Sequence, residues 1–435
     1  MIEEGLNKLK NREVLTALNI FKKLHKLNPN DGDILFFLGN IYYELNDLKK
    51  SLFYLERSLE KYPNSEAIVN NYAITLQSLG KIDKAKKLFL KLIQSNPNNI
   101  KAYFRLFRMN VKNFEKKYLD KIKLIEKEQN LTLGDKSLIN FIYSKCEKKK
   151  NISNEIKFLN LAHKYQFNSR LKYNSRSVEY HTNILMNNFN NINLIDKKET
   201  SPTKFKKKPI FIIGLPRSGS TLIESLIMQK KNEFYSYGES SIFDTIIFNQ
   251  IKKNLDKNNN IKISINREIL VNSLENIYSY SKNKNFIDKS LENFFYIELI
   301  LQVYPEAKFI HTFRNKFDAT LAIYHSMLIY LPWAHSIDHI IKYILNYEKI
   351  ISYFKNKYPE KILDVSLEKF TTQPNEQLKK IFDFCNIDWD EDILKSYDNN
   401  DLSSKTSSFL QIRDKIKKYE SDKYKPYYYL IENKF

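Results

Sequence analysis

A 34-residue period organises the first hundred residues of the chain. Pro29, Pro63 and Pro97 recur at this spacing. Three further sets of residues recur at the same spacing. Two sets consist of small residues: Gly5, Gly39 and Ala73, and Ala17, Ser51 and Ala85. The third consists of large apolar residues: Phe21, Leu55 and Phe89. Small residues where two helices cross, with a proline after the second helix, describe a helical hairpin. Because one hairpin cannot cover its own apolar face, the period predicts a stack of hairpins, an α-solenoid.

The period is that of the tetratricopeptide repeat. We predict repeats over about residues 1–31, 32–65 and 66–99, within a tetratricopeptide region spanning 1–110. The helical pattern then continues without the period, which predicts further helical hairpins over 111–190. Stacked repeats form a concave groove. Two interpretations of this groove remain open: it binds a peptide or partner protein, or the repeats are a scaffold packed on the rest of the chain.

Residues 209–222 run from an apolar strand through a short Gly/Ser loop into a helix: Pro-Ile-Phe-Ile-Ile-Gly-Leu-Pro-Arg-Ser-Gly-Ser-Thr-Leu. The backbone N–H groups of such a loop and the positive end of the following helix bind an anionic group. A Walker loop has Lys before its Ser/Thr, but Ser220 occupies that position. The cation of this loop is Arg217, two residues before Gly219, which favours a nucleotide whose single 5′-phosphate carries a group to be transferred.

The composition of the chain changes between these two regions. Residues 187–208 contain Asn runs and a Lys-rich stretch, which is typical of linker composition, and we place the linker at 191–208. Short apolar segments then alternate with helical patterns, which predicts a P-loop-type α/β domain with a mostly parallel sheet over 209–435. The chain is therefore expected to be multidomain, an α-solenoid followed by an α/β domain. Strands are expected near 209–214, 285–288, 307–313 and 361–365, and helices near 220–229, 291–303, 317–330, 336–355 and 374–386.

Polar residues follow two of the predicted strands, where ligands bind in a parallel sheet. One strand ends in the segment 286–293, Phe-Ile-Asp-Lys-Ser-Leu-Glu-Asn, and another stops at Arg314. A guanidinium there can bind a phosphate with two parallel hydrogen bonds. The alternative is an ion pair between Arg314 and Asp318, one helical turn further on. Together with the loop at 214–221, phosphate binding is favoured.

The segments just described carry a family resemblance. The region from about 209 to 425 resembles the P-loop-fold sulfotransferases, and the whole chain is similar to the bacterial tetratricopeptide-sulfotransferase proteins, whose catalytic half resembles protein-tyrosine sulfotransferases. The matching segments are, in order, Ile-Gly-Leu-Pro-Arg-Ser-Gly-Ser-Thr-Leu (213–222), Tyr-Gly-Glu (237–239), Asp-Lys-x-x-x-Asn (288–293), Tyr-Pro-Glu-Ala-Lys-Phe-Ile-His (304–311) leading into Arg314, and Thr-Ser-Ser-x-x-Gln-Ile-Arg (406–413).

The resemblance implies 3′-phosphoadenosine 5′-phosphosulfate (PAPS) as co-substrate and no metal. Its phosphosulfate would lie against Arg217, Ser218, Gly219, Ser220 and Thr221, and its 3′-phosphate against Arg314. Ser408 and Arg413 would close over the nucleotide. For the transfer itself, the resemblance implies Glu239 as general base, Lys289 as a cation on the transferring group, and Arg217 beside it. A carboxylate that takes the acceptor proton and cations that stabilise developing charge suit this chemistry.

Two positions depart from the family pattern, and two other functions remain open. Ala322 stands where the family has a Ser on the 3′-phosphate, with Ser326 a helical turn further, and Leu291 replaces a Pro. One alternative is therefore a repeat-based binding or scaffold protein with a degenerate nucleotide-binding domain. The other, a P-loop kinase, is disfavoured by Ser220. The expected acceptor is a hydroxyl of a peptide, protein or glycan, reached through the repeat groove and through loops within 231–285.

Charge and cysteine content limit the remaining possibilities. The formal charge of +21 comes from basic residues that are spread along the chain, in a Lys/Asn/Ile-rich composition, so nucleic-acid binding is not expected. The two cysteines, Cys146 and Cys385, are isolated, which indicates neither a disulfide framework nor a thiolate metal site. The acidic N-terminus and the lack of a long apolar run predict a cytoplasmic protein without a membrane span.

Overall fold

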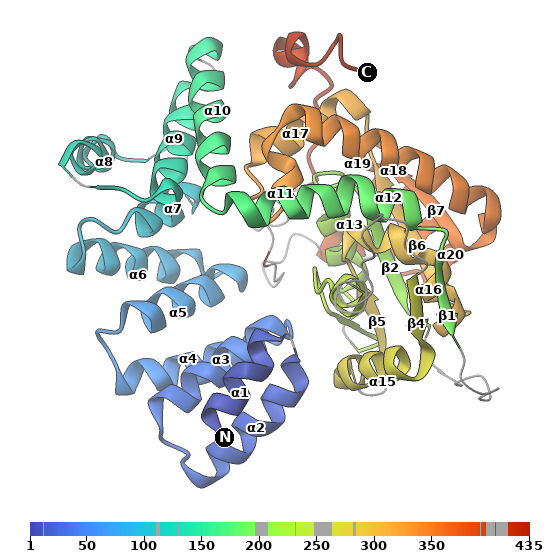
Figure 1. The fold of residues 1–435 in the computed structure, drawn as a ribbon, viewed down its shortest axis with the longest axis horizontal. Coiled ribbons are helices and arrows are strands. Elements are labelled where there is room, and N and C mark those ends of the chain that lie inside the picture. The colour runs from blue at the N-terminus through green and yellow to red at the C-terminus, as the bar shows by residue number, and fades with distance from the viewer. Residues whose placement is uncertain are drawn as a thin grey trace.

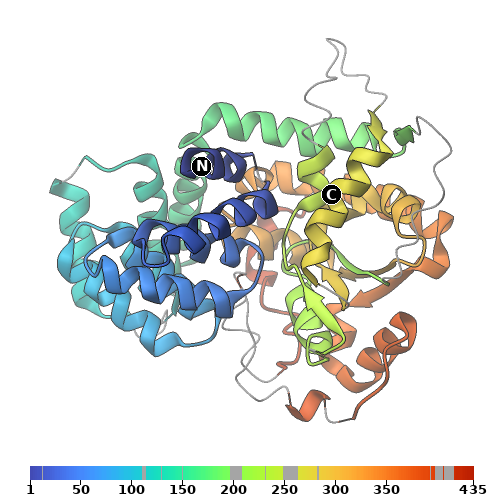
Figure 2. The same ribbon diagram turned by 90° about the horizontal axis from the view of Figure 1, so that it is seen from below.

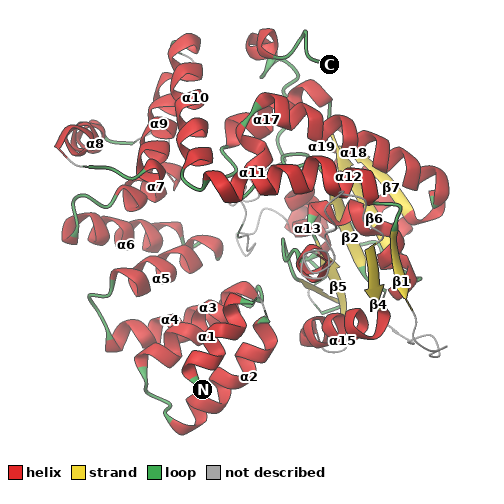
Figure 3. Ribbon diagram, viewed as in Figure 1, coloured by secondary structure: helices red, strands yellow, loops and turns green. Residues whose placement is uncertain are grey.

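The computed structural model describes residues 1–11, 13–109, 114–128, 130–148, 150–195, 208–230, 232–247, 263–281, 284–391, 393–396, 405 and 416–435. A helical N-terminal region and an α/β domain lie side by side in two perpendicular views (Figure 1, Figure 2). The strands gather in the second of these two parts (Figure 3). The predicted fold class, an α-solenoid followed by a P-loop-type α/β domain, is confirmed.

The first six helices pack in sequence order as three helical hairpins: α1 (Ile2–Lys10) with α2 (Val14–Leu27), α3 (Gly32–Glu44) with α4 (Leu48–Lys61), and α5 (Glu66–Ser78) with α6 (Ile82–Ser95). The small residues of the 34-residue period lie where the paired helices cross. A Cβ atom on Gly5 would come within 2.6 Å of the ring of Phe21, and one on Gly39 within 2.6 Å of Leu55. The small residues therefore recur every 34 positions because two helices approach each other closely in each repeat.

Helices continue after the repeats: α7 (Ile100–Met109), α8 (Lys116–Glu128), α9 (Leu133–Glu147) and α10 (Ile152–Asn168). Helices α9 and α10 form a further closely packed hairpin. The next segment differs, because α11 (Leu171–Glu179), a π-helical turn (Tyr180–Ile184) and α12 (Leu185–Asn188) make one helical run that extends across the α/β domain (Figure 1). It packs on α18 (Ile337–Lys357) and on the 3₁₀ helix Pro332–His335.

The main sheet has five parallel strands in the order β3 (Phe234–Ser236), β5 (Asn285–Asp288), β2 (Ile210–Gly214), β6 (Lys308–Phe313) and β7 (Ile362–Ser366). The central strand β2 is buried along its whole length, and the ring of Phe211 stacks on that of Phe309 with centroids 5.5 Å apart. Because the strands are parallel, their carboxyl ends share one edge of the sheet, which is where ligands bind in such folds.

Two short strands form a separate parallel pair, β1 (Ile192–Ile195) and β4 (Ile263–Asn266). Strand β1 lies within 191–208, the segment that we interpreted as a linker, so the sequence analysis missed it. It also missed β3 and β4. The four strands that were predicted are observed within one residue of the expected bounds.

The helices of the α/β domain cover the sheet and connect its strands: α13 (Ser220–Ile227), α15 (Arg267–Tyr278), α16 (Ile297–Val303), α17 (Lys316–Ser326), α18, α19 (Leu367–Thr372), α20 (Pro374–Cys385) and α21 (Ile393–Ser396). Further 3₁₀ helices span Ser279–Ser281, Leu291–Tyr296, Pro359–Lys361 and Lys425–Leu430. Helix α17 ends four residues before the predicted position. Within the described ranges, no helix has both the length and the apolar composition needed to cross a lipid bilayer.

Candidate active site

The loop after β2 has a backbone that only particular residues can adopt. Gly214 has a φ of 138°, and a Cβ atom there would lie 2.1 Å from the carbonyl oxygen of Thr312 on the neighbouring strand. Gly219, directly before α13, has a φ of 91°, and Arg217 has a φ of 68°. Such left-handed conformations favour glycine. The two glycines thus let the loop turn tightly from the sheet edge into the N-terminus of α13, as a phosphate-binding loop requires.

Side-chain hydrogen bonds hold this loop in shape. The hydroxyl of Ser218 donates to the carbonyl of Leu215 at 2.5 Å and lies 2.9 Å from the hydroxyl of Thr312. Ser218 is fully buried, so its hydroxyl stabilises the loop instead of facing the cavity. Ser220 and Thr221 form the first turn of α13 and line the cavity described below.

Arg314 lies one residue beyond β6 and contacts the same loop. Its Nη1 donates to the carbonyl of Arg217 at 3.2 Å, and its Nη2 donates to the hydroxyl of Tyr419 at 2.8 Å. The ion pair with Asp318 that we considered is present at 3.5 Å. The rings of Tyr419 and Tyr424 lie 4.9 and 5.6 Å from the guanidinium carbon. Nε of Arg314 is buried and has no hydrogen-bond partner among the described residues, so it retains a donor for a ligand.

Arg217 and Arg314 bring two positive charges to one place. Burial lowers the pKa of Arg217, Arg314 adds to this effect, and Tyr424 and Glu239 oppose it. Arginine stays protonated even so. Two guanidinium groups with like charge at one place favour an anionic ligand.

Lys289, directly after β5, lies between two carboxylates. Its side chain is 0% exposed, and its Nζ lies 2.7 Å from Oε1 of Glu239 and 3.6 Å from Oε2 of Glu224 on α13. Burial disfavours the charged lysine, but Glu239 and Glu224 outweigh burial and raise the pKa of Lys289. Two predicted catalytic residues, Glu239 and Lys289, are therefore in direct contact.

The turn that carries Lys289 is shaped by the buried Asp288. Its carboxylate accepts hydrogen bonds from the hydroxyl of Tyr278 at 2.7 Å, the backbone N–H of Ser290 at 2.8 Å and the amide of Asn293 at 3.2 Å. Leu291 begins the 3₁₀ helix that follows. These bonds explain the Asp-Lys-x-x-x-Asn spacing, because the first and last residues close the turn.

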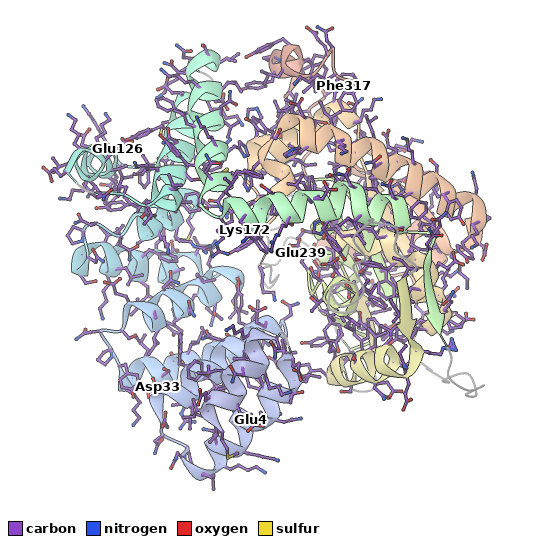
Figure 4. The ribbon with its side chains drawn as sticks, viewed as in Figure 1. Glu4, Asp33, Glu126, Lys172, Glu239 and Phe317 are labelled. Atoms are coloured by element: carbon purple, nitrogen blue, oxygen red, sulfur yellow. The ribbon has the colours of Figure 1, made fainter. Side chains whose placement is uncertain are left out.

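A single cavity of about 550 Å³ joins the loop after β2, Arg314 and Glu239. Its lining includes Gly214, Arg217, Gly219, Ser220, Thr221, Arg314 and Glu239. Glu239 lies on the side of the α/β domain that faces the repeat helices (Figure 4). The predicted residues Ser408 and Arg413 lie outside the described residues. No set of three or more His, Cys, Asp or Glu side chains arranged to hold a metal ion occurs in the part of the chain that the structure describes.

Carboxylates also line the cavity, beside aromatic and aliphatic side chains. Asp244 and Glu292 line it together with Leu328, Leu331, Trp333 and Tyr343, and the rings of Trp333 and Tyr343 stack with centroids 3.8 Å apart. The carboxylate of Glu292 makes long contacts: 3.4 Å to Nε1 of Trp333, 3.5 Å to the hydroxyl of Tyr343 and 3.8 Å to Nε2 of His181. Burial and then Asp244 raise the pKa of Glu292, against the opposing effect of His181.

Several lining residues were not predicted from the sequence. Lys423, Tyr419 and Tyr424 come from the C-terminal segment. Asp244 and Glu292 carried no motif. Ala322 is buried in α17 and is not among the lining residues, and the hydroxyl of Ser326 donates to the carbonyl of Ala322 at 2.6 Å. Ser326 thus does not replace the missing family serine in this arrangement.

Comparison with known proteins finds two kinds of similarity in this chain. Residues 209–391 match the model of the sulfotransferase family, and residues 9–67 and 67–99 match tetratricopeptide repeat models. A region that matches tetratricopeptide repeat models is thus followed by a region that matches the sulfotransferase model. The resemblance found in the sequence is therefore confirmed, and the cavity lies in the sulfotransferase domain.

Individual relatives are distant. A protein of Aquifex aeolicus, named only as an uncharacterized protein, is 23% identical over 449 residues, which cover 98% of this chain and 55% of that protein. The chain thus spans about half the length of this relative. A tetratricopeptide repeat-containing protein of Methanocaldococcus jannaschii is 30% identical over 106 residues, covering 24% of this chain and 18% of that protein. The sulfotransferase domain of the Synechococcus PCC 7002 olefin synthase is 18% identical, with a TM-score of 0.35, and the match covers 52% of this chain and 91% of that domain.

Proposed function

We propose that the protein transfers a sulfuryl group from 3′-phosphoadenosine 5′-phosphosulfate to an acceptor hydroxyl. One observation carries the proposal: a single cavity is lined by the loop after β2, by Arg314 and by Glu239, within a sulfotransferase-family domain. An anion-binding loop, a second cation and a carboxylate are the groups that such a transfer requires.

The donor site fits a nucleotide with two anionic groups. The loop residues Arg217, Ser218, Gly219, Ser220 and Thr221 would hold the 5′-phosphosulfate at the N-terminus of α13, and Ser218 would do so only through its backbone. Arg314 would hold the 3′-phosphate, since its buried Nε lacks a described acceptor. Ser408 and Arg413 remain proposed donor contacts, from the resemblance alone. The Ser220 hydroxyl in place of a lysine disfavours a triphosphate.

Glu239 would act as general base. As its carboxylate takes the proton of the acceptor hydroxyl, the acceptor oxygen forms a bond to sulfur, and the bond from sulfur to the 5′-phosphate oxygen breaks. The products are the sulfated acceptor and the bisphosphate nucleotide. Lys289, 2.7 Å from Glu239, would orient the carboxylate and supply positive charge near the reacting oxygens, while Arg217 stabilises the leaving phosphate. Positioning of the two substrates in line supplies much of the remaining rate.

The acceptor is proposed to be a hydroxyl of a peptide, protein or glycan that enters the cavity. Asp244 and Glu292 line the cavity, and a negatively charged acceptor would be repelled by them. A neutral or positively charged group next to the acceptor hydroxyl is therefore favoured. The stacked Trp333 and Tyr343 provide an apolar wall for an aromatic ring or a sugar face.

Calorimetric titration tests the donor class. Wild-type protein is titrated with 3′-phosphoadenosine 5′-phosphate, with ATP and 5′-AMP as controls. We expect micromolar binding of the bisphosphate and weak binding of both controls. Arg314→Ala should abolish most of the affinity, whereas Arg57→Ala, which removes a partly exposed arginine of the repeat helix α4, should leave it unchanged. Equal affinity for ATP, or no binding of any nucleotide, would refute the proposal.

A further inference from the structure

The turn between the two helices of the second repeat lies against the strand that leads to the proposed base. Nδ2 of Asn46 donates to the carbonyl of Ser236 at 2.9 Å, and the hydroxyl of Tyr235 donates to the carbonyl of Leu45. Ser236 is the last residue of β3, and Glu239 follows three residues later. The repeat domain therefore touches the active-site edge of the sheet through specific hydrogen bonds.

The backbone of Asn46 is held in an unusual conformation to make this contact. Its φ is 63°, in the left-handed region that asparagine adopts more readily than most residues. The amide also lies over Gly238, where an added Cβ atom would come 3.7 Å from Nδ2 of Asn46. Asn46 thus covers the residue directly before Glu239.

A chain of hydrogen bonds continues from Ser236 into the catalytic pair. The Ser236 hydroxyl donates to Glu224 and accepts from the N–H of Gly238 at 3.0 Å. The carbonyl of Gly238 in turn accepts from the backbone N–H of Lys289 at 2.9 Å. Because Glu224 is also 3.6 Å from Nζ of Lys289, the same strand end fixes both the backbone and the charge of this lysine.

Lys405 makes a second link between the same repeat and the sulfotransferase domain. Its Nζ donates to the carbonyls of Tyr43 at 3.0 Å and Glu44 at 3.3 Å, and lies 5.1 Å from the centre of the Tyr43 ring. A cation at the C-terminal end of a helix is favourable, because the carbonyls there carry partial negative charge. The end of α3 is therefore anchored to the sulfotransferase domain at two points.

We propose that Asn46 is a positioning residue for the transfer reaction, through which the second repeat holds the end of β3 so that Glu239 and Lys289 meet. The inference rests on the proposed function and adds a role for the repeats that does not depend on what their groove binds. In this arrangement the sulfotransferase domain is incomplete without the second repeat.

Two substitutions isolate the amide of Asn46. Asn46→Asp keeps the size and the left-handed tendency but places an oxygen against the Ser236 carbonyl. Asn46→Gly keeps the backbone conformation, which glycine adopts freely, and removes only the side chain. Tyr280→Phe is the matched control, because its hydroxyl contacts Asp47 at 2.7 Å and Lys50 at 3.0 Å in the same interface without joining the chain to Ser236.

Three measurements are made on each full-length variant: bisphosphate affinity, hydrogen exchange of peptides covering 232–240, and turnover of the donor with the best acceptor or with water. We expect both Asn46 variants to exchange faster in that segment and to lose at least about tenfold in kcat, with donor affinity unchanged within twofold. Tyr280→Phe should match wild type in all three.

The outcomes separate the two proposals. Unchanged exchange in the segment, or wild-type kcat in both Asn46 variants, overturns the positioning role even when the bisphosphate binds. A loss of donor affinity that parallels the loss of kcat also overturns it, since the side chain would then support the fold only. Absence of bisphosphate binding by wild type instead refutes the proposed function.

Discussion

Oε1 of Glu239 lies 2.7 Å from Nζ of Lys289, yet the lysine side chain is 0% exposed and the glutamate side chain is 52% exposed. The glutamate side chain therefore contacts the buried lysine on one side and is exposed to the cavity on the other. Such a pair is asymmetric, because loss of the buried partner leaves charge uncompensated inside the protein, whereas loss of the exposed partner leaves a lysine that Glu224 still contacts.

Glu239→Gln and Lys289→Met should consequently differ. Glu239→Gln should reduce kcat by about 10²–10⁴-fold, the usual contribution of a general base, with little change in melting temperature. Lys289→Met should reduce kcat and also destabilise the fold by roughly 3 kcal/mol, since Glu224 loses its buried cation. Urea unfolding and donor turnover on both variants check this, and equal stability losses would contradict the asymmetry.

Glycine at position 214 should be irreplaceable. Gly214→Ala would place a methyl group 2.1 Å from the Thr312 carbonyl at a φ of 138°, which forces β2 and β6 apart. We expect insoluble protein or a loss of more than about 3 kcal/mol. Gly134→Ala in α9 is the control, because its nearest contact would be 3.6 Å and alanine favours a helix. Thermal melts compare the two, and a soluble Gly214→Ala protein with normal melting temperature would disprove the steric argument.

Lowering the pH should destabilise the protein already at pH values above those at which most carboxylates titrate. Burial lowers the pKa of His325 and of His335 to about 4. The unfolded chain binds these protons near pH 6.5 and the folded chain does not, so stability falls as pH decreases from about 6.5 toward 4. Unfolding free energies measured from pH 7.5 to 5 should rise with pH, and these two histidines should contribute up to two protons to the slope. His335→Asn should flatten this slope by about one proton, and an unchanged slope would count against the prediction.

Glu292→Gln should change acceptor use without changing donor binding. The substitution removes one negative charge from the cavity while keeping the shape of the side chain. For acceptors with an amine beside the hydroxyl, we expect a KM increase of about tenfold, and for the N-acetylated counterparts little change. The bisphosphate affinity measured by calorimetry should stay at the wild-type value. Equal KM effects on both acceptor types would rule out a charge contribution from Glu292.

The fold was predictable where local pattern and tertiary contact coincide. Gly5 and Gly39 recur because helices meet at those positions, and the strand at 210–214 is apolar because it is buried on both faces. Strands β3 and β1 were missed because three- and four-residue strands are too short to show alternation. Their existence depends on pairing with β5 and β4, which the local sequence does not encode.

The candidate site was predictable only as far as its motifs extend. Glu239, Lys289 and Arg314 stand at strand ends in segments that resemble a family, and the first two prove to be in contact. Glu224 lies seven residues after Arg217, but no motif marked it as a site residue. Its contact with Lys289 forms only in the folded protein, between α13 and the end of β5. The hydroxyl of Ser218 had the right position but is turned into the loop.

The bonds that Ser218 makes to Leu215 and Thr312 fix the anion loop through the protein alone. A loop that already has its bound shape loses little conformational freedom on association, so more of the interaction energy appears as affinity. Donor capture should therefore be fast and governed by diffusion and charge, and the slow steps of turnover should lie with the acceptor.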